Sequence, residues 1–145
     1  MRKQKGFTLI ELVVVVMILG ILAAVAAPKL LNTSSTAADN GLKQTLGVVR
    51  DAIERYAAEH AGSLPGDAGT EADLKADLLP YLRGTFPKCP VAGANDQVKI
   101  TTAAGAIVGE AAPTKSWHYN SADGQFICNS TANSKSDPAV SYDDF

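Results

Sequence analysis

Glu11 is an ionisable side chain inside the longest apolar stretch of this 145-residue chain. The stretch runs from Phe7 to Ala27, and only Thr8, Glu11 and Gly20 interrupt it. As a helix rising about 1.5 Å per residue it would be roughly 32 Å long, enough to cross the hydrocarbon core of a bilayer. A carboxylate there costs about 2.5–3.5 kcal/mol on insertion scales, so it is normally retained for a function and has a partner.

A cut just before the apolar run would supply such a partner. The residues before the run include three bases and no acid, and they end at Gly6. Cleavage between Gly6 and Phe7 would create an α-amino group one helical turn before Glu11 and on the same helix face. A buried negative charge would then have a new positive charge within reach.

Three interpretations fit a basic start followed by an apolar run. A cleaved secretory signal peptide is one, but its apolar region spans about 7–15 residues and this run is longer. An ordinary one-pass anchor with its basic start in the cytoplasm is the second. Only the third, a segment processed at Gly6, gives Glu11 a role.

The sequence KGFTLIEL at residues 5–12 resembles the class III signal of type IV pilins and type II secretion pseudopilins. The resemblance implies that a prepilin peptidase cuts after Gly6 and methylates the new N-terminal Phe7. It also implies that Glu11 pairs with the N-terminal amine of a neighbouring subunit during filament assembly. Pro28 matches a common pilin proline and is expected to kink the helix, because it lacks a backbone donor.

These features divide the chain into three parts. Residues 1–6 form a cleaved leader, 7–27 a transmembrane and assembly helix, and 28–145 one small extracytoplasmic domain that includes the second half of the long helix. The leader holds three of the 13 Lys and Arg residues. The remainder of the chain therefore contains ten basic residues and all 15 acidic residues. This mildly acidic balance argues against a general nucleic-acid-binding surface.

The fold class predicted from the pattern is α+β, a pilin-like long helix packed on a small antiparallel sheet. An amphipathic stripe continues the helix from Ala37 to His60, after a polar segment, 32–36, that could interrupt it. The stripe consists of Leu42, Leu46, Val49, Ile53 and Tyr56.

Further elements follow the long helix. Thr70 and Asp73 predict the N-cap of a second helix. Residues 97–101 and 106–108 are predicted as short strands around a turn at 103–105. Trp117 to Cys128 reads as a hairpin that turns at Asp123-Gly124, and no regular structure is expected from 129 to 145. The hairpin and the segment YAAEHAGSLP, residues 56–65, resemble those of the major pseudopilins.

Cys89 and Cys128 are the two cysteines. An even count in an oxidising, extracytoplasmic compartment suggests a disulfide, which would contribute about 3–4 kcal/mol in the loop-entropy model. Two free thiols or a metal pair are the alternatives, and the wide spacing is unlike that of a zinc site.

The chain carries no catalytic set, because His60 and His118 are unlinked and no nucleophile motif accompanies them. An enzyme is therefore not expected. Resemblance to the major pseudopilins implies a calcium ion held by oxygen ligands in the C-terminal loops. The available carboxylates are Asp123, Asp137, Asp143 and Asp144, and the alternative is a solvated acidic tail.

The function implied is that of a structural subunit of a type II secretion pseudopilus, polymerised into a helical filament that supports protein export. A type IV pilin of a surface pilus is the first alternative, and a membrane-tethered binding module without filament assembly is the second. The implied partners are further copies of the chain, the prepilin peptidase, an inner-membrane assembly platform, minor pseudopilins and the membrane. The protein would be a single-pass inner-membrane protein with its C-terminal domain in the periplasm or outside.

Overall fold

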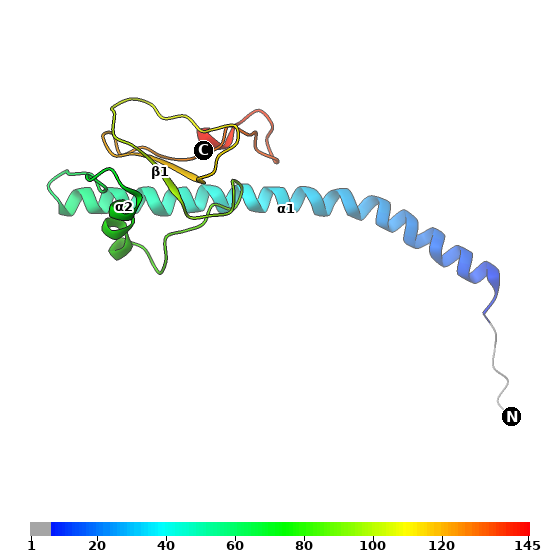
Figure 1. Ribbon diagram of the computed structural model, residues 1–145. Helices are drawn as coiled ribbons and strands as arrows, with labels where there is room; N and C mark the ends of the chain where they lie inside the picture. Colours follow the sequence, from blue (N-terminus) through cyan, green and yellow to red (C-terminus); the bar gives the residue numbers. More distant parts are fainter. Residues whose placement is uncertain (1–6) are drawn as a thin grey trace. The chain divides into compact units, whose positions relative to one another are not determined.

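The computed structural model describes residues 7–145, which divide into two compact units. The first unit ends at Ser35 and the second is Thr36–Phe145. Helix α1, Leu9–Glu59, contributes residues to both units (Figure 1).

The first unit consists of the apolar part of α1 and the residues before it. Within α1, an 18-residue window has a mean hydropathy of 3.0, and none of that window is buried against other parts of the protein. By length and composition this helix can cross a membrane. Pro28 lies inside α1 and does not end it.

The predicted interruption at residues 32–36 is wrong, because the backbone stays helical throughout. A short polar side chain need not leave a helix when it can hydrogen-bond a carbonyl one turn back. Thr33 does this, with Oγ1 donating to the carbonyl of Lys29 at 2.9 Å.

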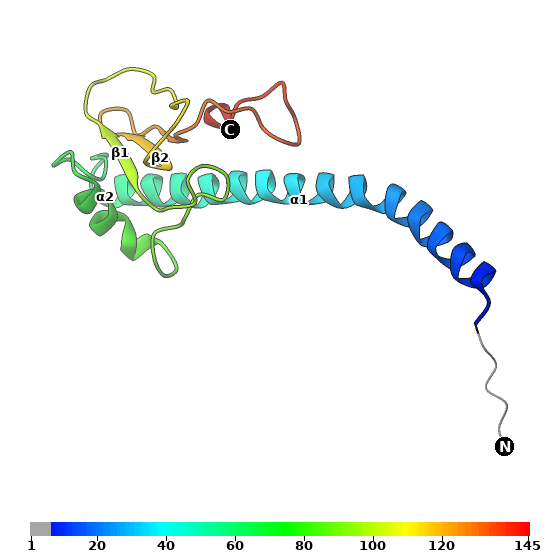
Figure 2. The same ribbon diagram turned by 45° about the vertical axis from the view of Figure 1, so that its right-hand side comes forward.

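The second unit is built on the C-terminal part of α1, and the predicted stripe is its packing face. Leu42, Leu46, Val49 and Ile53 are buried in one core cluster, and Tyr56 packs against its edge. Figure 2 shows the sheet beside this part of the helix, with α2, Glu71–Leu78, near the helix end. The long helix is therefore the spine of the domain.

The predicted second helix is confirmed, including its cap. Thr70 is the N-cap of α2, and its side chain accepts a hydrogen bond from the backbone N–H of Asp73 at 3.2 Å. Pro80 lies in a 3-10 turn, η1, Leu79–Tyr81, that follows α2 directly. From this turn the chain runs beside α1 toward Cys89.

The sheet has three strands in the order β1-β2-β3: β1 Val98–Thr101, β2 Trp117–Asn120 and β3 Phe126–Cys128. The hairpin of β2 and β3 is antiparallel and confirmed, with Trp117 opposite Cys128 and Tyr119 opposite Phe126. The predicted α+β pilin-like class is confirmed, but the sheet is mixed and not purely antiparallel, because β1 and β2 run parallel. A parallel pair needs a crossover connection, which residues 102–116 provide.

That connection also explains why residues 106–108 are not a strand. Instead of turning back at 103–105, the chain loops across and comes very close to residue 130. A Cβ on Gly109 would lie 2.6 Å from the backbone N of Ser130, so only glycine fits without a shift. The ion pair of Lys99 with Glu110, at 2.7 Å, joins the loop to β1.

The C-terminal residues 129–145 are more ordered than predicted. Asn133 and Ser141 form an antiparallel bridge, and Tyr142–Asp144 form a 3-10 turn, η2. Asp39 on α1 holds this segment: one carboxylate oxygen accepts hydrogen bonds from Ser134 Oγ at 2.5 Å, from Ser136 N at 3.1 Å and from Ser136 Oγ.

Candidate functional site

The start of α1 is a capping box, which is the feature that positions Glu11. Thr8 precedes the first helical residue, and its backbone N–H and Oγ1 donate to Glu11 Oε2 at 2.9 Å and 2.7 Å. In return, Glu11 N donates to Thr8 Oγ1 at 3.3 Å. Reciprocal bonds of this kind satisfy two of the free donors at a helix start. The sequence pattern Thr-x-x-Glu, which is typical of a capping box, is formed here by Thr8 and Glu11.

Glu11 lies on an exposed apolar surface. Phe7, Ile10, Val14 and Val15 line with it an open hollow of about 430 Å³, and the Phe7 side chain is 76% exposed. Within residues 7–145, no ion pair engages the Glu11 carboxylate. The predicted cleavage residue Gly6 lies outside the described residues. The site thus presents a carboxylate with one local hydrogen-bonding partner and room for a cation.

Cys89 and Cys128 meet in the domain core, although neither is near the other in sequence. Both side chains are fully buried, and their sulfur atoms lie 3.8 Å apart as free thiols. The hydrogen bond between the two thiols lowers the pKa of Cys89. The predicted disulfide is not formed in this structure, but the two cysteines predicted to form it lie next to each other.

The four acidic residues predicted as calcium ligands are not brought into one site. Asp123 accepts from Gly105 N at 2.6 Å in the hairpin turn, and Asp143 accepts from Gly109 N at 2.9 Å. The other two accept bonds within their own loops, Asp137 from Ala139 N and Asp144 from Ser141 Oγ. Across residues 7–145 no cluster of three or more His, Cys, Asp or Glu side chains could hold a metal ion. Each of these carboxylates therefore stabilises a loop by accepting hydrogen bonds.

The two histidines are structural. His60 stacks on Tyr56 with ring centroids 3.9 Å apart at the end of α1. His118 is buried in β2, and its ring nitrogens contact Thr101 Oγ1 at 2.8 Å and the carbonyl of Val108 at 3.1 Å. Burial lowers the pKa of His118, so the ring is neutral at physiological pH.

Asp39 is a residue that the sequence-based reasoning missed. Its side chain is 2% exposed, yet it lies in line with the apolar stripe, three residues before Leu42 and seven before Leu46. An acid in register with a packing face signals a buried partner. That partner turned out to be Ser134, which is 95 positions away in the sequence.

Comparison with known proteins agrees with the site at the helix start. Residues 1–27 match the family model described as the prokaryotic N-terminal methylation motif. The type IV major fimbrial protein FimA of Dichelobacter nodosus is 35% identical over 150 residues, covering 93% of this chain and 94% of that protein.

Shorter matches reach other relatives. Type II secretion system core protein G of Vibrio cholerae is 39% identical over 83 residues, or 57% of each chain. Prepilin peptidase-dependent protein D of Escherichia coli is 44% identical over 70 residues, or 48% of each chain. The chain thus spans about half the length of these two relatives. No solved structure matches it significantly.

The fold and the site define an α+β protein with a long N-terminal helix, an apolar anchor and a methylation motif. The chain belongs to the type IV pilin and pseudopilin family. Members of this family are structural subunits, and the chain is not an enzyme. The apolar helix and the motif fit a single-pass anchor in the inner membrane.

Proposed function

We propose that the protein is the major-pseudopilin-like subunit of a type II secretion pseudopilus, a helical filament that supports protein export. Prepilin peptidase would cut between Gly6 and Phe7, leaving a methylated N-terminus on each subunit. The mature domain would face the periplasm, and an inner-membrane assembly platform and minor pseudopilins would help to build the filament. The observation that carries the proposal is the Glu11 carboxylate on the exposed apolar face of α1, which has no ionic partner among residues 7–145.

The mechanism follows from the charge and its surroundings. The two hydrogen bonds from Thr8 satisfy one oxygen of the Glu11 carboxylate but do not neutralise its charge. The Phe7 amine of a neighbouring subunit would neutralise it. A subunit displaced along the filament would leave the carboxylate unpaired in an apolar surrounding, which is costly. Charge pairing would therefore both favour docking and fix the axial register.

The capping box permits an experiment that separates the effect of the Glu11 charge from the effect of capping the helix N-terminus. Glu11→Gln keeps an amide oxygen that can accept from Thr8, so the cap is retained while the charge is lost. Thr8→Ala is the matched variant, because it removes the cap and keeps the carboxylate. We expect Glu11→Gln to be processed and inserted normally but to yield few or no sheared filaments, and Thr8→Ala to retain more filament. Normal filaments from Glu11→Gln would refute the assembly mechanism.

The processing step has its own test. Gly6→Leu places a bulky residue at the cleavage point, and we expect uncut precursor to accumulate in the membrane. Mass spectrometry of the parent should find a mature chain that begins with N-methyl-Phe7. Normal processing of Gly6→Leu would show that the cut lies elsewhere.

A surface pilus is the second candidate, because the fimbrial relative matches nearly the whole chain whereas the core protein G match covers 57% of it. Deletion of the gene distinguishes the two. Loss of secreted proteins from the medium with surface fibres intact would support the pseudopilus. Loss of surface fibres with normal secretion would replace it with the pilus. A deletion with neither phenotype would favour a tethered binding module.

A further inference from the structure

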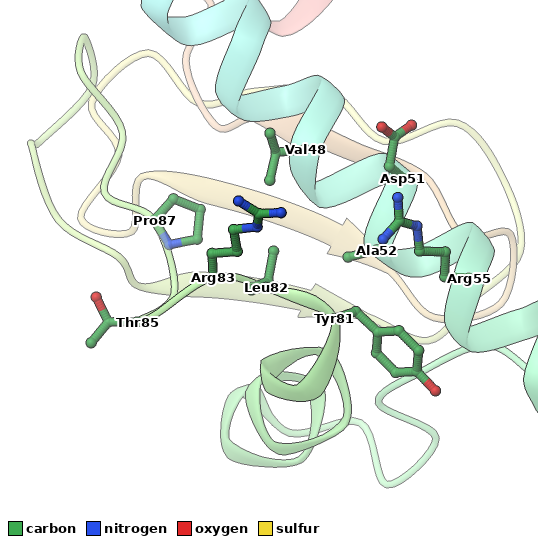
Figure 3. Close-up of a pocket in the computed structure, with 9 residues that line it drawn as sticks. All are labelled: Val48, Asp51, Ala52, Arg55, Tyr81, Leu82, Arg83, Thr85 and Pro87. Carbon is green, nitrogen blue, oxygen red and sulfur yellow. The ribbon is translucent and has the colours of Figure 1, made fainter.

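A cleft in the second unit lies between α1 and the segment 81–87 (Figure 3). Its volume is about 370 Å³. Val48 and Ala52 on α1 face Leu82 and Pro87 across it and give it an apolar lining. Val48 is 49% exposed, so the cleft opens to solvent on a partly apolar floor.

Two arginines contribute to this cleft from different elements. Arg55 comes from α1, and Arg83 extends from the segment after η1 toward the helix (Figure 3). Within residues 7–145, neither guanidinium lies within 4.0 Å of a carboxylate oxygen, so neither forms an ion pair. Asp51, one turn before Arg55, is the single acid in the lining, so the cleft carries a net positive charge.

One further acid, Glu59, lies one helical turn after Arg55. Glu59 accepts a hydrogen bond from the hydroxyl of Tyr81 at 2.6 Å. By contrast, Arg50, on another side of α1, donates to the carbonyls of Phe126 and Phe145 at 3.0 Å and 2.7 Å. Arg50 is thus bonded within the domain, whereas no hydrogen bond or ion pair in the described part of the chain engages the guanidinium of Arg55 or Arg83.

We propose that this arginine cleft, defined by Arg55 and Arg83 over the floor of Val48 and Leu82, binds an acidic side chain on the domain surface of a second copy of the chain. The inference rests on the proposed filament and adds a contact in the globular domain to the one at Glu11. Guanidinium groups pair with carboxylates through parallel hydrogen bonds, and two of them can enclose one carboxylate.

Charge complementarity favours a second copy as the occupant. Outside the leader the chain has ten bases and 15 acids, so a positive cleft on one copy meets a predominantly acidic surface on the next. A cleft on one subunit that receives a different surface of its neighbour makes a heterologous contact. Such contacts generate open helical assemblies when the rotation does not close. The cleft therefore suits a filament better than a symmetric dimer.

The test uses the full-length protein in assembling cells. Arg55→Glu with Arg83→Glu should lower the yield of sheared filaments about five- to thirtyfold, while membrane levels and processing stay unchanged. Arg55→Lys with Arg83→Lys keeps the charge and should retain most of the yield. The matched control is Lys135→Glu, which reverses an exposed charge in the tail, away from the cleft residues.

A photo-crosslinking amino acid at Thr85, on the rim of the cleft, identifies the occupant directly. The expected product is a crosslink to an acid-bearing peptide of the same protein, lost in the double glutamate variant. Crosslinks to a different protein alone, or normal filaments from the double glutamate variant, would overturn the proposal. Absence of filaments from the parent chain would instead refute the proposed function. In that case, a crosslink from Thr85 to a second copy would still support the cleft as a binding site for another copy of the chain.

Discussion

Removing the carboxylate of Asp39 should release the C-terminal segment from α1. The structure allows the cost to be estimated, because the three donors to this carboxylate differ in exposure. Ser134 is buried, so its bond at 2.5 Å has no replacement from solvent, whereas Ser136 is exposed and water can replace its bonds. One charge-assisted hydrogen bond contributes about 1.5–3 kcal/mol. We therefore expect Asp39→Ala to destabilise the domain by about 2–3 kcal/mol.

The second unit, Thr36–Phe145, has about 110 residues. With an unfolding entropy of about 2.1 cal/mol/K per residue, a loss of 2–3 kcal/mol lowers the melting temperature by roughly 9–13 °C. The assay is thermal unfolding of the purified full-length protein in detergent, followed by the fluorescence of the buried Trp117. Ser136→Ala is the matched control and should change the melting temperature by less than half as much.

Asp39 also predicts a pH dependence. Burial raises the pKa of its carboxyl, but the hydrogen bonds from Ser134 and Ser136 outweigh burial and hold the pKa below its ordinary value. A carboxyl with a lowered pKa in the folded state stabilises the protein above its unfolded pKa, and this contribution is lost as pH falls through the folded value. The stability difference between the parent and Asp39→Asn should therefore be constant above about pH 4 and shrink below it. A parent and an Asp39→Ala variant with equal melting temperatures would refute the reasoning, as would a difference that does not change with pH.

Two further predictions concern the same domain. In exported protein never exposed to reductant, we expect a non-reducing peptide map to show Cys89 linked to Cys128, because their sulfurs are 3.8 Å apart in an otherwise dry core; two alkylatable thiols would contradict it. Gly109→Ala should destabilise the domain by about 1–3 kcal/mol in the same thermal assay, because the new Cβ would overlap the backbone of Ser130. Gly47→Ala is its control for loss of glycine, since an added Cβ there meets open space, and it should not lower the melting temperature. Equal melting temperatures for the parent and Gly109→Ala would show that the loop yields without cost.

The sequence by itself determined the features that depend on near neighbours in the chain. Helical periodicity from Leu42 to Ile53 identified the packing face, and Thr70 identified the start of α2, because both signals act within one or two helical turns. The hairpin of β2 and β3 was recognisable for the same reason, since a short turn joins its strands. The motif around Gly6 and Glu11 indicated the family because its residues are contiguous.

Only the tertiary structure decided the features that join distant segments. Whether β1 pairs parallel or antiparallel depends on the path of residues 102–116, which the close approach of Gly109 to Ser130 constrains and which no local propensity encodes. The order of the tail depends on Asp39, whose burial is stable only when the hydroxyl of Ser134 reaches it. The arginine cleft likewise exists only because Arg83 folds back beside α1. Contacts of this kind are fixed by packing of the whole domain, and a single sequence read locally carries no record of which distant residues will meet.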